Sequence, residues 1–291
     1  MDHGVPRTVF VLAGGGSLGA TQVGMLRALT ERGVWPDAVV GSSAGAINAV
    51  FLAGDPTADG VRHLEAMWRG LARQDVFPIR AMLLLRSALG HGDHLVDPAA
   101  LRDLLTRHLP RARFEDLALP CVAIASDMLT GEEVQLVNGS AIDAALASAA
   151  IPLVFPPVEI DGRLLADGSI ASNTPVGAAI ALGATRVIVL PAGHACALGD
   201  RPRGMVAVAL HALSLLTARQ LGRDLEVLRD RAEIAIVPPL CPLDVSPYDF
   251  SRGGDLIDRA AAATEQWLAG GKLARREIPA TLAPHTHGPR A

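Results

Sequence analysis

The hydrophobic positions of the first fifty residues alternate between two patterns. Residues 8–13 and 38–40 are continuous apolar runs, which are typical of parallel strands buried on both faces. Residues 21–32 repeat apolar positions at helical spacing and carry charges on the other face, and residues 44–52 are a run of mostly small apolar residues. This order of strand, amphipathic helix, strand and buried helix predicts an α/β fold with a central, mainly parallel sheet.

The rest of the chain continues the alternation. Residues 55–119 have a charged helical pattern broken by prolines, with an apolar helix predicted at 81–89, and we interpret them as a helical insertion over the sheet edge. Further helices are predicted at 140–150, 205–232 and 255–268. Further strands are predicted at 120–126, 132–137, 158–160, 163–165, 186–190 and 233–237. Because no linker or internal repeat interrupts this pattern, we expect one domain.

The junction between the second strand and its helix carries a Gly-x-Ser-x-Gly sequence, Gly41-Ser42-Ser43-Ala44-Gly45. At a sharp strand-to-helix turn this spacing lifts the central hydroxyl above the sheet edge, and the glycines let other backbone pass close by. Ser43 would then stand at a helix N-terminus, where free N–H groups and the helix dipole stabilise a developing oxyanion. The sequence alone also fits an ordinary turn of small residues.

A glycine-rich loop, residues 14–19, joins the first strand to the first helix. Its Gly-x-Gly-x-x-Gly spacing matches the dinucleotide-binding fingerprint, which needs an acidic residue near the end of the second strand. Here that strand ends at Val40 and runs into the serine turn, while Asp37 lies at its opposite end. We therefore favour a loop whose backbone N–H groups face Ser43 as an oxyanion hole.

A serine nucleophile needs a base, and the sequence offers two arrangements. Asp167 follows a predicted hairpin in the sequence Asp167-Gly168-Ser169, which by itself also fits a simple Asx turn. A Ser-Asp-His hydrolase would use Ser43, Asp167 and His194, in the usual order for that fold. In that fold, however, several strands normally precede the serine turn, and here only one does.

Composition narrows the function classes. Half of the residues are hydrophobic and 3% are aromatic. The net charge is −4 and there is no basic tract, so the sequence offers no electrostatic basis for binding nucleic acid. The three cysteines, Cys121, Cys196 and Cys241, are far apart and fit neither a disulfide framework nor a close-spaced metal site. No signal peptide or membrane-spanning run is visible. We expect a soluble, cytoplasmic protein that can contact a membrane surface transiently.

Three ordered motifs together resemble the patatin-like phospholipase family over residues 9–190. They are the glycine-rich loop, the Gly-x-Ser-x-Gly turn and the sequence Asp167-Gly168-Ser169, and residues 147–152 and 155–158 are also similar. The resemblance implies a three-layer α/β/α fold with its catalytic region at 8–190. A C-terminal helical region at 191–278 would complete the same domain, and 279–291 would be a loose tail.

The resemblance also implies a chemistry and its residues. Ser43 would attack an acyl ester of a phospholipid, lysophospholipid or related lipid, and Asp167 would take its proton and later activate water. The oxyanion hole would be formed by Gly14, Gly15, Gly16, Ser17, Gly19 and Ala44. Leu18 stands where many members carry Arg or Lys, and Ser169 where many carry Gly or Ala. No metal or organic cofactor is implied.

Two alternatives stay open beside this reading. One is a Ser-Asp-His esterase that uses His194. The other is a catalytically silent protein of the same fold that binds acyl chains or a protein partner. The presence of both Ser43 and Asp167 favours an enzyme.

Overall fold

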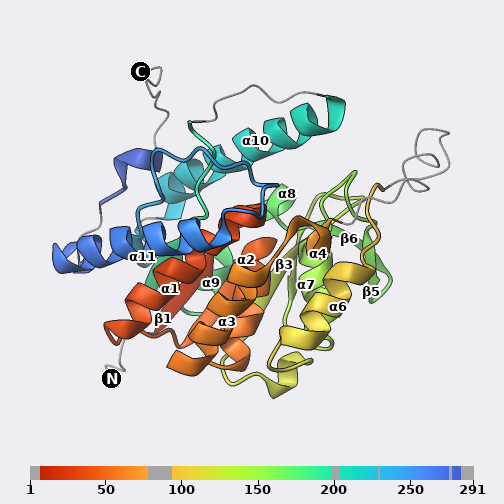
Figure 1. The fold of residues 1–291 in the computed structure, drawn as a ribbon. Coiled ribbons are helices and arrows are strands. Elements are labelled where there is room, and N and C mark those ends of the chain that lie inside the picture. The colour runs from red at the N-terminus through yellow and green to blue at the C-terminus, as the bar shows by residue number, and fades with distance from the viewer. Residues whose placement is uncertain (1–6, 78–93, 198–203, 229, 275–276, 283–291) are drawn as a thin grey trace.

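A central sheet of eight strands organises the computed structural model, which describes residues 7–77, 94–197, 204–228, 230–274 and 277–282 (Figure 1). The strand order is β5-β6-β3-β2-β1-β7-β8, and β4 pairs with β3 beside this path. The strands are β1 (Thr8–Leu12), β2 (Ala38–Ser42), β3 (Cys121–Asp127), β4 (Glu133–Leu136), β5 (Val158–Ile160), β6 (Arg163–Asp167), β7 (Arg186–Leu190) and β8 (Glu233–Ile236).

The centre of the sheet is parallel and one edge is antiparallel. Strands β3, β2, β1, β7 and β8 run parallel to one another, whereas β4 and β6 are antiparallel to β3, and β5 is antiparallel to β6. Because parallel strands end at the same edge, the segments after β1, β2 and β7 meet there. The predicted mainly parallel sheet is confirmed.

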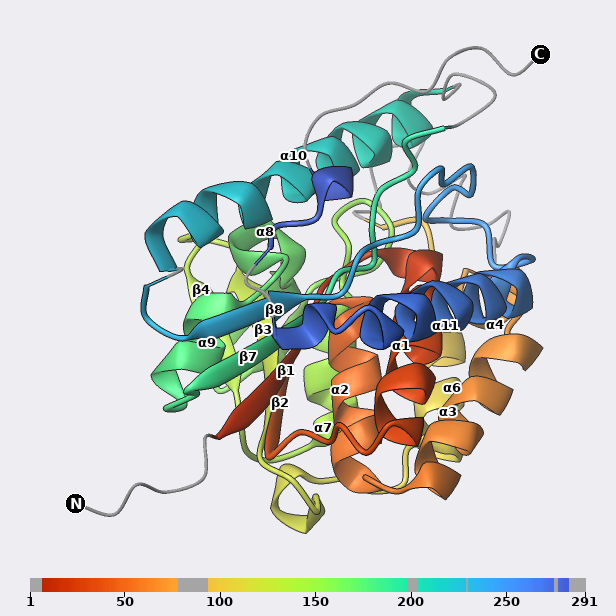
Figure 2. The same cartoon turned by 90° about the vertical axis from the view of Figure 1, so that its left-hand side faces the viewer.

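Helices cover both faces of the sheet, as Figure 2 shows. One face carries α1 (Gly19–Glu31), α2 (Ala44–Gly54), α3 (Ala58–Gly70), α4 (Arg73–Val76), α6 (Ala99–His108), α7 (Ala141–Ser148) and α11 (Gly253–Ala269). The other carries α9 (Val176–Ala181) and α10 (Met205–Leu228), while the short α8 (Ser169–Ser172) follows β6. The three-layer α/β/α architecture expected from the sequence is therefore present. No helix in the described ranges is both long and apolar enough to cross a membrane.

The alternating direction of side chains along β1 divides the core in two. Phe10 and Leu12 pack in the cluster that contains α1 and α2, while Val9 and Val11 pack in the cluster that contains α9 and α10. All four side chains are fully buried. This period of two is the expected geometry of a strand covered on both faces.

The segment 55–119 differs from its predicted position. Its helices α3 and α6 place Leu64 and Leu105, both fully buried, in the same core cluster as α1 and α2. They therefore belong to the main helical layer and are not confined to the sheet edge. The apolar helix predicted at 81–89 lies outside the described residues.

The C-terminal part of the chain returns to the N-terminal part. Helix α11 packs along α1, and a Cβ atom at Gly24 would lie 2.1 Å from the carbonyl oxygen of Ile257. The 237–252 segment before α11 reaches the glycine-rich loop, where the Ser17 N–H donates to the Pro247 carbonyl at 2.8 Å. This contact brings distant residues to the end of β1.

Candidate active site

Ser43 occupies a strained turn between a strand and a helix. β2 ends at Ser42 and α2 begins at Ala44, and Ser43 between them has φ 53° and ψ −126°. Positive φ is uncommon for a residue with a side chain, and such a conformation costs about 1–3 kcal/mol unless the surroundings enforce it. Ser43 is only 5% exposed. The expected sharp turn is therefore present at this serine.

The two glycines of the turn allow backbone to approach where a side chain would clash. A Cβ atom at Gly41 would lie 2.2 Å from the Gly45 carbonyl oxygen, and one at Gly45 would lie 2.2 Å from the Leu12 carbonyl oxygen. The turn consequently packs directly against the end of β1. This packing brings Ser43 next to the glycine-rich loop.

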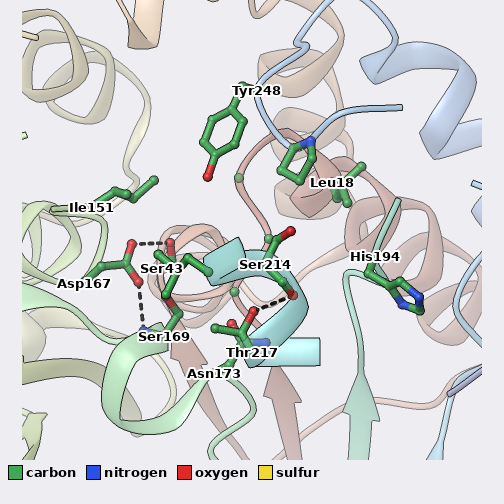
Figure 3. A pocket seen from close by; sticks show the side chains of 16 residues that line it. Leu18, Ser43, Ile151, Asp167, Ser169, Asn173, His194, Ser214, Thr217 and Tyr248 are labelled. Atoms are coloured by element: carbon green, nitrogen blue, oxygen red, sulfur yellow. Dashed lines mark hydrogen bonds between the residues drawn. The ribbon is translucent and has the colours of Figure 1, made fainter. Parts of the chain in front are cut away.

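Asp167 contacts Ser43 directly (Figure 3). It ends β6 and is fully buried, and its Oδ2 accepts a hydrogen bond from the Ser43 hydroxyl at 2.7 Å. Its Oδ1 accepts from the Ser169 N–H at 2.8 Å. Burial raises the pKa of the Asp167 carboxyl above its ordinary value, and the hydrogen bonds from Ser169 and Ser43 oppose that rise. The pKa of this carboxyl is therefore closer to that of an effective general base than the pKa of an exposed aspartate is.

Ser148 connects the backbone at Ser43 to the backbone next to Asp167. The sequence did not single it out as a site residue. Its hydroxyl accepts from the Ser43 N–H at 2.8 Å and donates to the Ile124 carbonyl at 2.5 Å. Its carbonyl accepts from the N–H of Gly168, next to Asp167, at 3.0 Å. The available signal was a hydroxyl within the apolar run 144–150, because a buried polar group needs partners.

The amides expected in an oxyanion hole fall into two groups. Those of Gly14, Ser17 and Gly19 already donate to carbonyls: Gly14 to Asn173 at 3.0 Å, Ser17 to Pro247 at 2.8 Å, and Gly19 to Gly16 and Ser17. The expectation that these three amides belong to the oxyanion hole is wrong, because an N–H that already donates to a carbonyl does not also stabilise an oxyanion. The amides of Gly15, Gly16 and Ala44 donate to no acceptor in the described ranges. Gly15, Gly16 and Ser43 line one cavity.

A buried polar network supports the glycine-rich loop. Gln22 donates through Nε2 to the carbonyls of Ala13 at 2.7 Å and Leu190 at 3.0 Å. Asn48 donates to Gln22 Oε1 at 2.9 Å and accepts from Trp68 Nε1 at 2.7 Å. A satisfied buried network of this kind is rigid, so it fixes the residue from which the loop begins.

Two cavities meet at Ser43, and Gly16 and Ile151 also line both. We call one the apolar cavity; its walls are almost entirely hydrocarbon and include Ile47, Met67, Leu71, Phe77, Leu104 and Phe155. We call the other the polar cavity; its walls include Asn173, His194, Ser214, Thr217 and Tyr248. Helix α10, which also contributes Leu213, thus borders the polar cavity.

His194 does not join the pair of Ser43 and Asp167. It lies across the polar cavity from Asp167 and its ring points away, as Figure 3 shows. Both carboxylate oxygens of Asp167 are engaged, by Ser43 and by Ser169. No imidazole stands between the serine and the carboxylate.

Two of the three cysteines, which are far apart in the sequence, lie close together in the structure. Cys196 and Cys241 follow β7 and β8, and their thiols are in hydrogen-bonding contact although neither is part of a disulfide. Parallel neighbouring strands explain this meeting, because they deliver their following loops to the same edge. Cys121 is buried in β3. Within the described residues, no group of three or more His, Cys, Asp or Glu side chains could hold a metal ion.

Comparison with known proteins gives consistent relatives. The family model of the patatin-like phospholipases matches residues 10–180. A Mycobacterium bovis protein named an uncharacterized NTE family protein is 35% identical over 173 residues, covering 59% of this chain and 45% of that protein. Patatin-like phospholipase domain-containing protein 7 of Rattus norvegicus is 29% identical over 185 residues, covering 63% of this chain and 13% of that one.

The solved structure of VipD from Legionella pneumophila has the same fold. It is similar over 91% of this chain and 67% of its own, with a TM-score of 0.50 and 17% sequence identity. The match to the Mycobacterium bovis relative spans less than half of that protein's length. The family model, in contrast, matches more than half of this chain and includes the Gly-x-Ser-x-Gly turn and the buried aspartate. The chain therefore belongs to the patatin-like phospholipase family.

Proposed function

We propose that this protein is a serine acyl hydrolase that cleaves carboxylic esters of phospholipids, lysophospholipids or related lipids. The observation that carries the proposal is the 2.7 Å hydrogen bond from the Ser43 hydroxyl to the buried Asp167 carboxylate, beside the unengaged amides of Gly15 and Gly16. A nucleophile, a base and oxyanion donors around one space are the parts that acyl transfer requires.

The proposed reaction runs through an acyl-enzyme. Ser43 Oγ attacks the ester carbonyl while Asp167 takes the hydroxyl proton, and the resulting oxyanion accepts hydrogen bonds from Gly15, Gly16 and Ala44. The C–O bond to the alcohol then breaks, and the proton held by Asp167 passes to the departing oxygen. Asp167 then takes a proton from water as the water oxygen attacks the acyl carbonyl, and this proton passes to Ser43 Oγ when the acyl C–Oγ bond breaks and the acid leaves. One oxyanion donor typically supplies about 2.7–4 kcal/mol of transition-state stabilisation.

The environment of Asp167 supports its role as the base. An aspartate of ordinary pKa, ~3.9, is a weak base toward a serine hydroxyl. Burial raises the pKa of Asp167, which narrows that mismatch. The direct bond to Ser43 favours a Ser-Asp dyad over a Ser-Asp-His triad.

The two cavities support a division of the substrate at the ester. The apolar cavity begins at Ser43 and is walled by aliphatic and aromatic side chains, so we place the acyl chain there. The polar cavity, with its hydroxyl and amide side chains, receives the alcohol part. This arrangement accommodates an ester that is apolar on one side and polar on the other.

The test is covalent labelling with a fluorophosphonate, followed by peptide mapping and ester turnover. Ser43→Ala should abolish both labelling and turnover. Ser42→Ala is the matched control, because Ser42 is fully buried and its hydroxyl has no partner in the described part of the chain. Labelling at Ser42, or full turnover by folded Ser43→Ala, would refute the assignment. A folded wild-type protein that neither labels nor cleaves any lipid ester would favour the silent alternative.

A further inference from the structure

The chain's one tyrosine, Tyr248, has its hydroxyl in the polar cavity. Figure 3 shows that hydroxyl directed toward the space beside Ser43 and Asp167. The residue lies on the segment between β8 and α11, outside the 10–180 region that the family model matches. Its position therefore comes from the fold of the C-terminal part of the chain.

The hydroxyl of Tyr248 is available to a ligand. No side chain or carbonyl in the described ranges bonds to it, and both carboxylate oxygens of the nearby Asp167 already have partners. Burial and the negative charge of Asp167 raise the pKa of the Tyr248 phenol, so it keeps its proton at neutral pH. The group is accordingly a neutral hydrogen-bond donor that faces the reacting centre.

The phenol is held in place from two sides. Its ring packs against Phe77, with ring centroids 6.2 Å apart. The preceding residues are bonded to the glycine-rich loop: Ser17 donates through its N–H to the Pro247 carbonyl at 2.8 Å and through its hydroxyl to the Ser246 carbonyl at 3.0 Å. Tyr248 is thus fixed relative to the loop that presents the Gly15 and Gly16 amides.

We propose that Tyr248 is a catalytic residue that donates a hydrogen bond to the alkoxy oxygen of the ester as the alcohol departs, an inference that rests on the proposed function. The alkoxy oxygen faces the polar cavity when the acyl chain occupies the apolar cavity. As the C–O bond breaks, negative charge grows on that oxygen, and the donated hydrogen bond stabilises it. Tyr248 keeps its own proton, because the proton that completes the alcohol is the one Asp167 took from Ser43.

Tyr248→Phe tests the proposal with two esters of the same acyl chain. An alkyl ester has a poor leaving group that needs this hydrogen bond, whereas an aryl ester such as the p-nitrophenyl ester leaves as a stabilised phenolate. We expect kcat/KM for the alkyl ester to fall about 10- to 100-fold, the range for a hydrogen bond to a developing charge, and that for the aryl ester to change by less than about threefold. The rate of fluorophosphonate labelling should stay unchanged.

Leu104→Ala is the control for the acyl side that both esters share, since Leu104 lines the apolar cavity and does not line the polar cavity that contains Tyr248. It should affect the two esters to a similar extent. Equal losses for both esters in Tyr248→Phe, or no loss for either, would overturn the proposal. Failure of the proposed function would be seen separately, as a wild-type protein that cleaves neither ester and does not label at Ser43, and it would remove this inference as well.

Discussion

The two cavities that meet at Ser43 come from different parts of the chain. The apolar cavity is built mainly from α2, α3, α4, α6 and the segment after α7, which lie in the 10–180 region that the family model matches, and Phe250 is added from beyond it. The polar cavity takes His194, Ser214, Thr217 and Tyr248 from beyond that region. The acyl side of the proposed site therefore lies mostly inside the matched region, whereas the alcohol side also depends on residues outside it. The contrast indicates where differences in substrate choice should be sought.

The largest effect should come from the base that acts on Ser43, the serine at which both cavities meet. Asp167→Asn keeps the shape but removes the base, so turnover should fall about 10²–10⁴-fold for every ester, whatever its chain or alcohol. His194→Ala, on the polar side only, should cost less than about tenfold because the imidazole takes no part in this proton transfer. Steady-state kinetics on a panel of esters measures both. Equal losses in the two folded variants would replace the dyad with a Ser-Asp-His triad.

The pH profile sharpens the same test. The base must be ionised, and burial raises the pKa of Asp167, so the acid limb of activity should lie above the ~3.9 of an exposed aspartate. It should be identical in His194→Ala.

A raised carboxyl pKa favours folding at low pH, and that contribution is lost as the pH rises through the folded-state pKa. Asp167→Asn should therefore gain stability relative to wild type at neutral pH, and the gain should vanish in acid.

The next largest effect should come from the oxyanion amides. A Cβ atom at Gly15 would lie 2.4 Å from that of Ala192, so Gly15→Ala must displace the loop. We expect kcat to fall about 10²–10³-fold, the cost of losing one such donor. Adding Ala192→Gly makes room for the new methyl group and should restore much of the activity. If the double variant, folded and labelled normally, gained nothing, the loop position would not explain the loss.

Chain-length preference should respond to the apolar cavity alone. Leu104→Trp reduces its space and should lower the ratio of kcat/KM for long-chain over short-chain esters by about tenfold or more. Leu104→Ala should shift the ratio toward longer chains. Thermal unfolding must accompany the assay, because overpacking a core costs about 1–3 kcal/mol. An unchanged ratio in both variants would show that the acyl chain lies elsewhere.

The smallest effect should come from a single hydroxyl on the far wall of the polar cavity. Thr217→Val removes a hydroxyl that also donates to the Ser214 carbonyl at 3.1 Å. We expect a loss of about two- to tenfold that depends on the alcohol and leaves the chain-length ratio unchanged. A shift in chain-length preference instead would contradict the division between the cavities.

Local sequence was enough to predict the elements that carry the nucleophile. The apolar runs of β1 and β2, the small-residue helix α2 and the turn around Ser43 depend on neighbours in the chain, and each was predicted close to its bounds. The occupied Ser17 amide, by contrast, depends on Pro247, more than two hundred residues away. The position of Tyr248 in the polar cavity and the contact between Cys196 and Cys241 likewise depend on tertiary packing, which the spacing of residues in the sequence does not reveal.

The backbone of Ser43 has a consequence for engineering. Its φ of 53° suits glycine, so Ser43→Gly should unfold at a higher temperature than Ser43→Ala, which loses the same hydroxyl but keeps the strain. Relief of about 1–3 kcal/mol should outweigh the roughly 0.4–1 kcal/mol by which glycine favours the unfolded chain. Differential scanning calorimetry of the two variants measures this difference. A library selected for heat resistance alone would therefore drift toward glycine at this position and lose the nucleophile, so such a screen must select for turnover as well.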